Sequence, residues 1–300
     1  MNTAQIIGLI ETKLRTLLSF KPNDFEEFES WYREVEVQTF ADTLTEYLPI
    51  RQSVLKLVYK NLFGCMPFEK EYVLKNYLHD KFALKYLIYP SNKPKRLLVL
   101  FSGFINRVTF NRYSWYWDPT EKWEQDSVYL FLNDPTCHWY VGAKGEDALR
   151  KYSAIILETL DFYGLKQNQL HTCGASMGGY AAILYGLKLQ AKSIISVHPQ
   201  FSIKNAKRYV NSTIWSNKIY ECGNQFIDLD DVVACYKHRP NLYLEISQNP
   251  ADVVGVESFI NEYMKNQSLI LARKTNEVEH ETKSPSLELI NDLINLFEKS

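Results

Sequence analysis

The stretch Gln169-Leu-His-Thr-Cys-Gly174-Ala-Ser176-Met-Gly178-Gly179-Tyr-Ala-Ala-Ile-Leu184 decides how the chain folds. A short apolar run leads into Gly-x-Ser-x-Gly-Gly, and a run of small residues typical of a closely packed helix follows. This order predicts a strand, a sharp turn and a helix, the context in which a serine serves as a nucleophile. Glycines on both sides of Ser176 let strand and helix pass closely, because no Cβ stands between them. An ordinary glycine-rich turn is the alternative interpretation.

The predicted turn would place the Ser176 hydroxyl above the sheet at a helix N-terminus, where free N–H groups favour negative charge. We expect the Met177 N–H to form one half of an oxyanion hole. The second half is expected from the backbone of Gly103 or Phe104, which follow the apolar strand 96–101. Taken alone, Gly103 is also compatible with a plain turn.

A serine nucleophile needs a base and an acid, and the chain supplies them in the order Ser, Asp, His. Asp252 comes just after a predicted strand, and His280 lies between the last predicted strand and the closing helix. We therefore predict that His280 accepts the Ser176 proton and that Asp252 orients the imidazole and stabilises its cation. Glu257 and Glu279 are the alternative acids. This chemistry requires no metal ion.

The order of these three residues along the chain is that of the α/β-hydrolase fold, which has a mostly parallel sheet flanked by helices. Residues 81–300 are expected to form this catalytic domain, and residues 201–240 a helical insertion over the site. Residues 1–80 are expected to form a helical N-terminal extension. Its aromatic stripe Phe25, Phe28, Trp31 and Tyr32 has two interpretations, a face that packs on the main domain or a contact for a protein partner or a second copy.

The composition excludes several classes of protein. With a net charge of -1, the chain creates no basic field for nucleic acid. Its 5 cysteines are scattered without a Cys-x-x-Cys pair, which argues against a zinc site and a disulfide framework. No apolar run is long enough for a transmembrane helix, and the N-terminus is typical of an amphipathic helix rather than a signal peptide. We therefore expect a cytoplasmic protein.

An aromatic-rich loop follows the strand that ends at Phe101. Loops at the carboxyl ends of strands usually build the binding site, and aromatic rings and arginines suit sugar faces and anionic groups. The candidate substrate-binding residues of this loop are Arg112, Tyr113, Trp115 and Trp117. His198, at the end of a later strand, has two interpretations, a general base or a wall of the substrate pocket, and its place in this fold favours the pocket wall. The alternative is a loop whose aromatic side chains point inward over the core.

Several short motifs carry a resemblance to a known group. They are Phe101-Ser-Gly-Phe, Arg112-Tyr-Ser-Trp115, Asn133-Asp-Pro-Thr136, Gly174-Ala-Ser-Met-Gly-Gly179 and His198-Pro-Gln200. From about residue 80 to residue 300 the chain resembles bacterial α/β-hydrolase-fold proteins of surface-glycan pathways. These include capsular polysaccharide biosynthesis proteins of the XcbB/CpsF type, capsule O-acetyltransferases and the glycan-acetylating protein of the accessory secretion system. The resemblance implies O-acetylation or related acyl chemistry on carbohydrate, with no bound cofactor and acetyl-CoA as a candidate acyl donor.

The sequence therefore predicts a serine acyltransferase or esterase that acts on a cell-surface, capsular polysaccharide or its precursor. Hydrolysis and transfer share one acyl-enzyme, and the outcome depends on whether water or a sugar hydroxyl reaches it. The alternative is a non-catalytic glycan-binding or assembly protein that retains the hydrolase fold.

Overall fold

The computed structural model describes most of the chain. The described residues are 3–17, 25–40, 47, 50–63, 70–104, 110, 125–202, 213–266, 268–278 and 285–300. Their packing separates two compact units, one that runs up to Tyr77 and one that begins at Leu78. Among these residues, no helix combines the length and the apolar character needed to cross a bilayer.

The first unit is helical. Its helices are α1 (Thr3–Leu17), α2 (Phe25–Phe40), α4 (Arg51–Phe63) and α5 (Lys70–Tyr77). Phe28 and Tyr32 are fully buried in a core formed within this unit. At the edge of that core, Arg51 Nε donates to Glu36 Oε1 at 2.7 Å. Two members of the predicted aromatic stripe are therefore accounted for by the unit's own packing.

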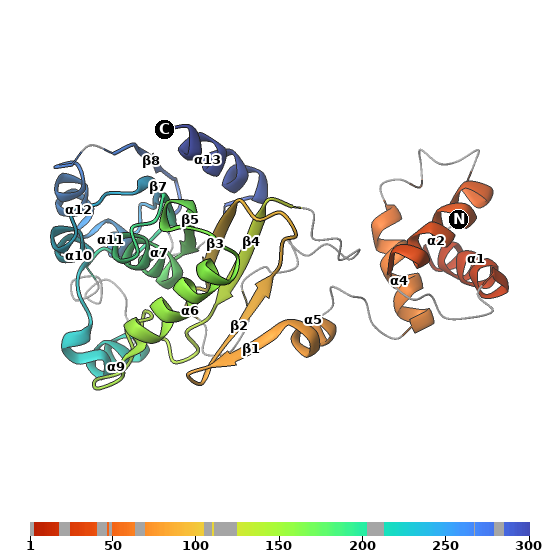
Figure 1. Cartoon of the computed structure of the whole chain (residues 1–300), viewed down its shortest axis with the longest axis horizontal. Helices are drawn as coiled ribbons and strands as arrows, with labels where there is room; N and C mark the ends of the chain where they lie inside the picture. The colour runs from red at the N-terminus through yellow and green to blue at the C-terminus, as the bar shows by residue number, and fades with distance from the viewer. Residues whose placement is uncertain are drawn as a thin grey trace. The chain divides into compact units, whose positions relative to one another are not determined.

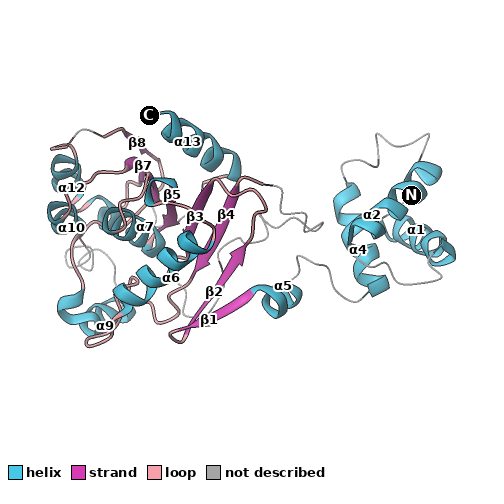
Figure 2. Ribbon diagram, in the orientation of Figure 1, coloured by secondary structure: helices cyan, strands magenta, loops and turns pink. Residues whose placement is uncertain are grey.

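The second unit is built on one sheet of eight strands (Figures 1 and 2). The strands are β1 (Leu78–Lys81), β2 (Leu84–Tyr89), β3 (Arg96–Phe101), β4 (Ser127–Leu132), β5 (Leu170–Ala175), β6 (Ser193–Val197), β7 (Asn241–Ile246) and β8 (Ile270–Lys274). Their order across the sheet is β1-β2-β4-β3-β5-β6-β7-β8. Only the β1–β2 and β2–β4 pairs are antiparallel, and the five pairs from β4 to β8 are parallel.

Strands β3 and β4 are nearly all apolar, as is typical of strands with both faces covered. Every residue of β4 and β5 is buried. Helices surround the sheet in Figure 1. They are α6 (Ala148–Phe162), α7 (Met177–Lys188), α9 (Thr213–Cys222), α10 (Leu229–Cys235), α11 (Pro250–Val253), α12 (Val256–Tyr263) and α13 (Leu287–Lys299).

The register of the parallel strands brings their carboxyl ends to one edge of the sheet. Phe101 at the end of β3 pairs with Gly174 in β5, and Ala175 at the end of β5 pairs with Val197 in β6. In open α/β sheets, this edge is where ligands bind. The topology therefore gathers the turns that follow β3, β5, β6, β7 and β8 on the side where the sequence predicts the site.

Candidate active site

The predicted turn between β5 and α7 is present, and it consists of a single residue. Ser176 adopts φ 56° and ψ -125°, a conformation that costs a side chain about 1–3 kcal/mol. Two backbone hydrogen bonds stabilise it: Ser176 N–H donates to Val197 O at 2.9 Å, and Tyr180 N–H donates to Ser176 O at 3.0 Å. The hydroxyl is thereby held where the strand ends and the helix begins.

Close backbone packing explains the glycines of the motif. A Cβ on Gly174 would lie 2.1 Å from the Gly178 carbonyl oxygen, and a Cβ on Gly178 would lie 2.3 Å from the Phe101 carbonyl oxygen. Real Cβ atoms do not approach other atoms so closely, so any side chain would push α7 away from β3 and β5. Because both positions lack a side chain, the N-terminus of α7 can pack directly against the end of β3.

This packing brings the predicted oxyanion-hole residues to the same edge. Met177 is the first residue of α7, where backbone N–H groups have no partner within the helix. Gly103 and Phe104 follow β3, and a Cβ on Gly103 would lie 3.5 Å from the Ala175 carbonyl oxygen. The turn after β3 is fixed because the Tyr140 hydroxyl donates to the Ser102 carbonyl at 3.0 Å.

Asp252 lies in α11, just beyond β7, and is fully buried. Its Oδ2 accepts a hydrogen bond of 2.7 Å from the Ser247 hydroxyl. Asn249 caps this short helix through the Ala251 N–H at 2.9 Å. Glu257, one alternative acid, is exposed in the first turn of α12.

The segment that leads toward the predicted base is attached to the same turn. Gln248 N–H donates to Glu277 O at 2.8 Å, and Asn249 Nδ2 donates to Val278 O at 3.0 Å. His280 and Glu279 lie outside the described residues, two positions and one position beyond Val278. The residues that lead into α11, which carries Asp252, are therefore hydrogen-bonded to the residues just before His280.

His198 and Gln200 follow β6. His198 is buried with a positive φ of 44°, and its Nε2 lies 3.0 Å from the Thr275 hydroxyl beyond β8. Gln200 Nε2 lies 3.5 Å from Ser176 Oγ. Gln200 has no predicted role, although it lies within the motif His198-Pro-Gln200. The relevant signal is its place two residues beyond His198, just after β6, which pairs with the strand that leads to Ser176.

A second unassigned residue, Trp139, comes from a strained loop after β4. Its φ is 52°, and Cys137 and Tyr140 also have positive values of 59° and 62°. The buried Asp134 carboxylate holds this backbone by accepting from His138 N–H at 2.8 Å and from Tyr140 N–H at 2.9 Å. The Trp139 indole consequently reaches Gln200, whose Oε1 accepts from indole Nε1 at 3.3 Å.

Aromatic rings surround Trp139. Its ring centroid lies 5.4 Å from that of Phe104, 5.5 Å from that of Trp215 on α9, and 5.9 Å from that of Phe226. The aromatic cluster therefore extends from Phe104, a predicted oxyanion residue, to Trp215 on α9 and to Phe226 between α9 and α10. The predicted substrate loop, with Arg112, Tyr113, Trp115 and Trp117, lies outside the described residues.

Burial makes the neighbouring thiol unreactive. Cys173 lies three residues before Ser176 in β5, and burial raises its pKa to about 12. A thiol with that pKa stays protonated near neutral pH and is a poor nucleophile. Within the described part of the chain, no three His, Cys, Asp or Glu side chains gather in a way that could hold a metal ion.

Solved structures with the same fold come from several kinds of protein. The glycosylation-associated Gap123 complex of Streptococcus agalactiae matches 74% of this chain and 45% of its own, at 18% identity and a TM-score of 0.55. The capsule O-acetyltransferase of Neisseria meningitidis serogroup A matches 74% of this chain and 94% of its own, at 14% identity and a TM-score of 0.56. A mutant of that protein has been solved in complex with CoA.

An S-formylglutathione hydrolase from Agrobacterium tumefaciens matches 74% of this chain and 92% of its own, at 13% identity and a TM-score of 0.51. The chain thus spans less than half of the Gap123 chain but corresponds to nearly the whole length of the other two. No protein-family model and no curated protein sequence matches it. Likeness at these identities identifies the fold, and the predicted α/β-hydrolase fold is confirmed.

Proposed function

We propose that this protein is a serine-dependent acyltransferase or esterase whose nucleophile is Ser176. The observation that carries the proposal is the strained single-residue turn, which glycine packing holds against the end of β3. Strain of this kind persists only where the surrounding structure maintains it, and it is concentrated at functional sites. Phe82, Ala83 and Gln190 also have a positive φ, so the conformation alone does not indicate catalysis. Ser176 differs because its strained backbone presents a hydroxyl at the first turn of α7, beside the end of β3.

In the proposed reaction, His280 removes the hydroxyl proton while Ser176 Oγ attacks the carbonyl carbon of an ester or thioester. The carbonyl oxygen becomes an oxyanion between the Met177 N–H and the backbone N–H of Gly103 or Phe104. The tetrahedral intermediate then collapses and expels the alcohol or thiol, which takes the proton from His280.

Deacylation repeats these steps with a different nucleophile. Water or a sugar hydroxyl loses its proton to His280 and attacks the acyl carbon, and the bond to Ser176 Oγ breaks. The serine oxygen recovers the proton, so the protein returns to its starting state. Water gives ester hydrolysis, whereas a sugar hydroxyl gives transfer of the acyl group.

The assignment of Asp252 rests on its place beside the segment that leads to His280. Asn249 both caps the helix that carries Asp252 and binds the Val278 carbonyl at 3.0 Å. A buried carboxylate at this place suits the role of orienting a histidine and stabilising its cation. Glu279 stays the alternative acid.

We propose a carbohydrate of the cell surface, such as a capsular polysaccharide or its precursor, as the acyl acceptor or the ester substrate. The structural likeness to a capsule O-acetyltransferase and to a glycosylation-associated complex supports this choice. The CoA complex of one neighbour supports acetyl-CoA as the acyl donor. In this proposal the loop with Arg112, Tyr113, Trp115 and Trp117, together with His198, binds the sugar.

The proposed arrangement of the chain follows from the same reasoning. Residues 81–300 would form the catalytic domain, with residues 201–240 over the site. Residues 1–80 would contact a protein partner or a second copy of the chain. The proposed place of action is the cytoplasm.

Labelling with a fluorophosphonate tests the proposed function. The reagent forms a stable bond only with a serine that its surroundings have activated. We expect it to modify Ser176 in the wild-type chain, as located by peptide mass spectrometry, and to leave the Ser176→Ala variant unmodified. A folded chain that stays unlabelled would instead favour a non-catalytic glycan-binding or assembly protein.

A further inference from the structure

Gln200 is a buried amide that contacts the proposed nucleophile without belonging to the proposed triad. Its side chain is fully buried, and Nε2 lies 3.5 Å from Ser176 Oγ and 3.3 Å from the His198 carbonyl oxygen. Its other end, Oε1, accepts a hydrogen bond of 3.3 Å from the indole of Trp139. The amide therefore lies between an aromatic cluster and the serine hydroxyl.

Two neighbours fix which way this amide points. The Trp139 indole nitrogen can only donate, so it selects the oxygen of Gln200. The His198 carbonyl can only accept, so it selects the NH₂ group. Both constraints give the same orientation, in which an N–H of Gln200 faces Ser176 Oγ.

We infer that Gln200 is a catalytic residue whose Nε2–H donates to Ser176 Oγ and stabilises the negative charge on that atom; this rests on the proposed role of Ser176. A contact of 3.5 Å is long for a neutral hydrogen bond, but it strengthens as the acceptor becomes an anion. An interaction that strengthens only as the reaction proceeds raises turnover rather than substrate binding.

The same N–H acts in both half-reactions. During acylation Oγ gains charge as its proton leaves, and during deacylation Oγ gains charge as its bond to the acyl carbon breaks. The oxyanion N–H groups stabilise the carbonyl oxygen instead. Gln200 thus supports the atom that serves first as nucleophile and then as leaving group.

The direct test replaces the donor while keeping the shape. Gln200→Glu keeps an oxygen for the Trp139 indole but places a carboxylate oxygen opposite Ser176. We expect kcat for a small ester, and the rate of fluorophosphonate labelling, to fall by about 10²-fold with KM little changed. Because a protonated carboxyl group can donate again, the ratio of variant to wild-type activity should rise as the pH is lowered.

A second variant covers the case in which a buried carboxylate prevents folding. Gln200→Met has a similar length and no charge, so it removes the donor without adding an anion. We expect a similar loss of kcat and no recovery at low pH. Trp139→Phe keeps an aromatic ring but no longer fixes the amide, so a smaller loss of about threefold to tenfold is expected.

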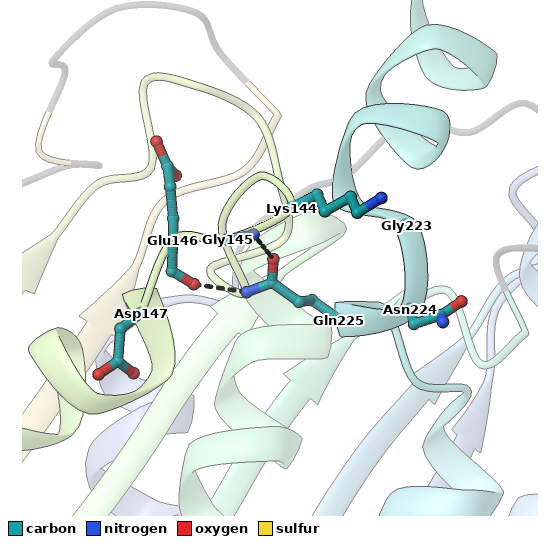
Figure 3. Close-up of a pocket in the computed structure, with 7 residues that line it drawn as sticks. All are labelled: Lys144, Gly145, Glu146, Asp147, Gly223, Asn224 and Gln225. Carbon is teal, nitrogen blue, oxygen red and sulfur yellow. Dashed lines mark hydrogen bonds between the residues drawn. The ribbon is translucent and has the colours of Figure 1, made fainter.

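The chain offers a matched control in Gln225, drawn in Figure 3. Gln225 Oε1 accepts from Gly145 N–H at 3.0 Å, and its Nε2 donates to the carbonyls of Val141 and Glu146. It thus holds the same loop that carries Trp139 and has no bond to Ser176 among these contacts. Gln225→Glu should lower thermal stability while activity per folded molecule stays within about twofold of wild type.

The outcomes separate this inference from the proposed function. If the wild-type chain is labelled at Ser176 and the folded Gln200 variants react at wild-type rates, the role of Gln200 is wrong and the nucleophile stands. If the folded wild-type chain is not labelled, the nucleophile itself is wrong. If Gln225→Glu lowers kcat as much as Gln200→Glu does, the loss comes from general disturbance of the loop that carries Trp139. Gln200 then has no specific role in catalysis.

Discussion

Two serines lie at opposite ends of the neighbouring strands β5 and β6. At the amino ends of β5 and β6, Ser193 Oγ lies 2.7 Å from His171 Nδ1, and Glu298 Oε1 lies 3.7 Å from the other ring nitrogen. These are the three residue types of a hydrolytic triad, and Ser193 and His171 are fully buried. At the carboxyl end of β5, Ser176 lies in a strained turn at the start of α7.

The difference teaches that residue types alone do not make a nucleophile. Ser193 lies in β6, which pairs with β5 on one side and β7 on the other. Its backbone pairs within the sheet, and its side chain is fully buried, whereas Ser176 keeps 5% of its surface exposed. Ser176 lies at the N-terminus of α7, beside the turn after β3. In the proposed mechanism, backbone N–H groups there stabilise a developing oxyanion. The surroundings of each hydroxyl therefore decide its chemistry.

The largest contrast should appear when each serine is replaced by alanine. Ser176→Ala should lower ester hydrolysis by about 10³-fold or more and leave the fold intact. Ser193→Ala should instead cost stability, about 1–3 kcal/mol, because a buried histidine nitrogen loses its partner. Initial rates and thermal melts of both variants check this. Comparable losses of activity in folded Ser176→Ala and Ser193→Ala would mean that Ser176 is not the specific nucleophile.

The next effect concerns the acid at the carboxyl edge. Asp252→Asn should lower kcat by about 10²- to 10⁴-fold with little change in KM, because an amide cannot stabilise the imidazolium. Glu298→Gln, the matching change at the amino edge, should leave kcat nearly unaltered. Steady-state kinetics of both variants provide the measurement. If Glu279→Gln lowered kcat and Asp252→Asn did not, the acid would be Glu279.

A smaller effect is expected from the predicted substrate loop. Trp115→Ala or Arg112→Ala should weaken action on a glycan by about tenfold more than action on a short nitrophenyl ester. The small ester lacks the groups that would contact this loop. Parallel kcat/KM values for both substrates give the ratio, and equal losses would assign these residues to the fold instead.

The smallest expected effect is a pH dependence of the free energy of unfolding, caused by His171 at the amino ends of β5 and β6. Burial lowers the pKa of His171, and the Glu298 carboxylate only partly opposes this. Above about pH 6.5 the ring is neutral in both folded and unfolded chains, so it contributes no pH dependence. As the pH falls below about 6.5, the unfolded chain binds a proton that the folded chain does not. The free energy of unfolding then falls until the pH reaches the folded-state pKa.

The slope of the free energy of unfolding against pH has an upper limit. One such group lowers the free energy of unfolding by at most about 1.4 kcal/mol per pH unit. Urea titrations at about pH 7 and about pH 5.5 should show a larger drop for the wild-type chain than for His171→Asn. If the free energy of unfolding fell equally with pH in the wild-type chain and in His171→Asn, His171 would bind its proton equally well in the folded and the unfolded state.

The parts of the fold that were predictable are those with a local cause. Apolar runs predicted the central strands, and the Gly174 and Gly178 spacing predicted the turn at Ser176 because close packing excludes a Cβ there. The β1–β2 hairpin was not predicted. Its turn is Phe82-Ala83, with positive φ values of 57° and 60°, and neither residue is among those that favour this conformation.

For the candidate site, the sequence predicted positions next to strands, while the catalytic roles stay predictions. Ser176, Met177 and Gly103 follow from motifs beside strands, whereas Gln200 and Trp139 meet only after the sheet is assembled. Trp139 reaches the site because the buried Asp134 carboxylate stabilises a strained loop, and no local pattern in the sequence signals that arrangement. Contacts between segments far apart in the chain require the topology first.

The most direct test of the central claim is to identify which serine carries the acyl group during turnover. The wild-type chain is mixed briefly with nitrophenyl acetate, quenched in acid, digested and analysed by peptide mass spectrometry. The account predicts an added acetyl group on the peptide that contains Ser176 and none on the peptide that contains Ser193. Acetylation at Ser193, or rapid turnover with Ser176 left unmodified under conditions that trap the intermediate, would contradict it.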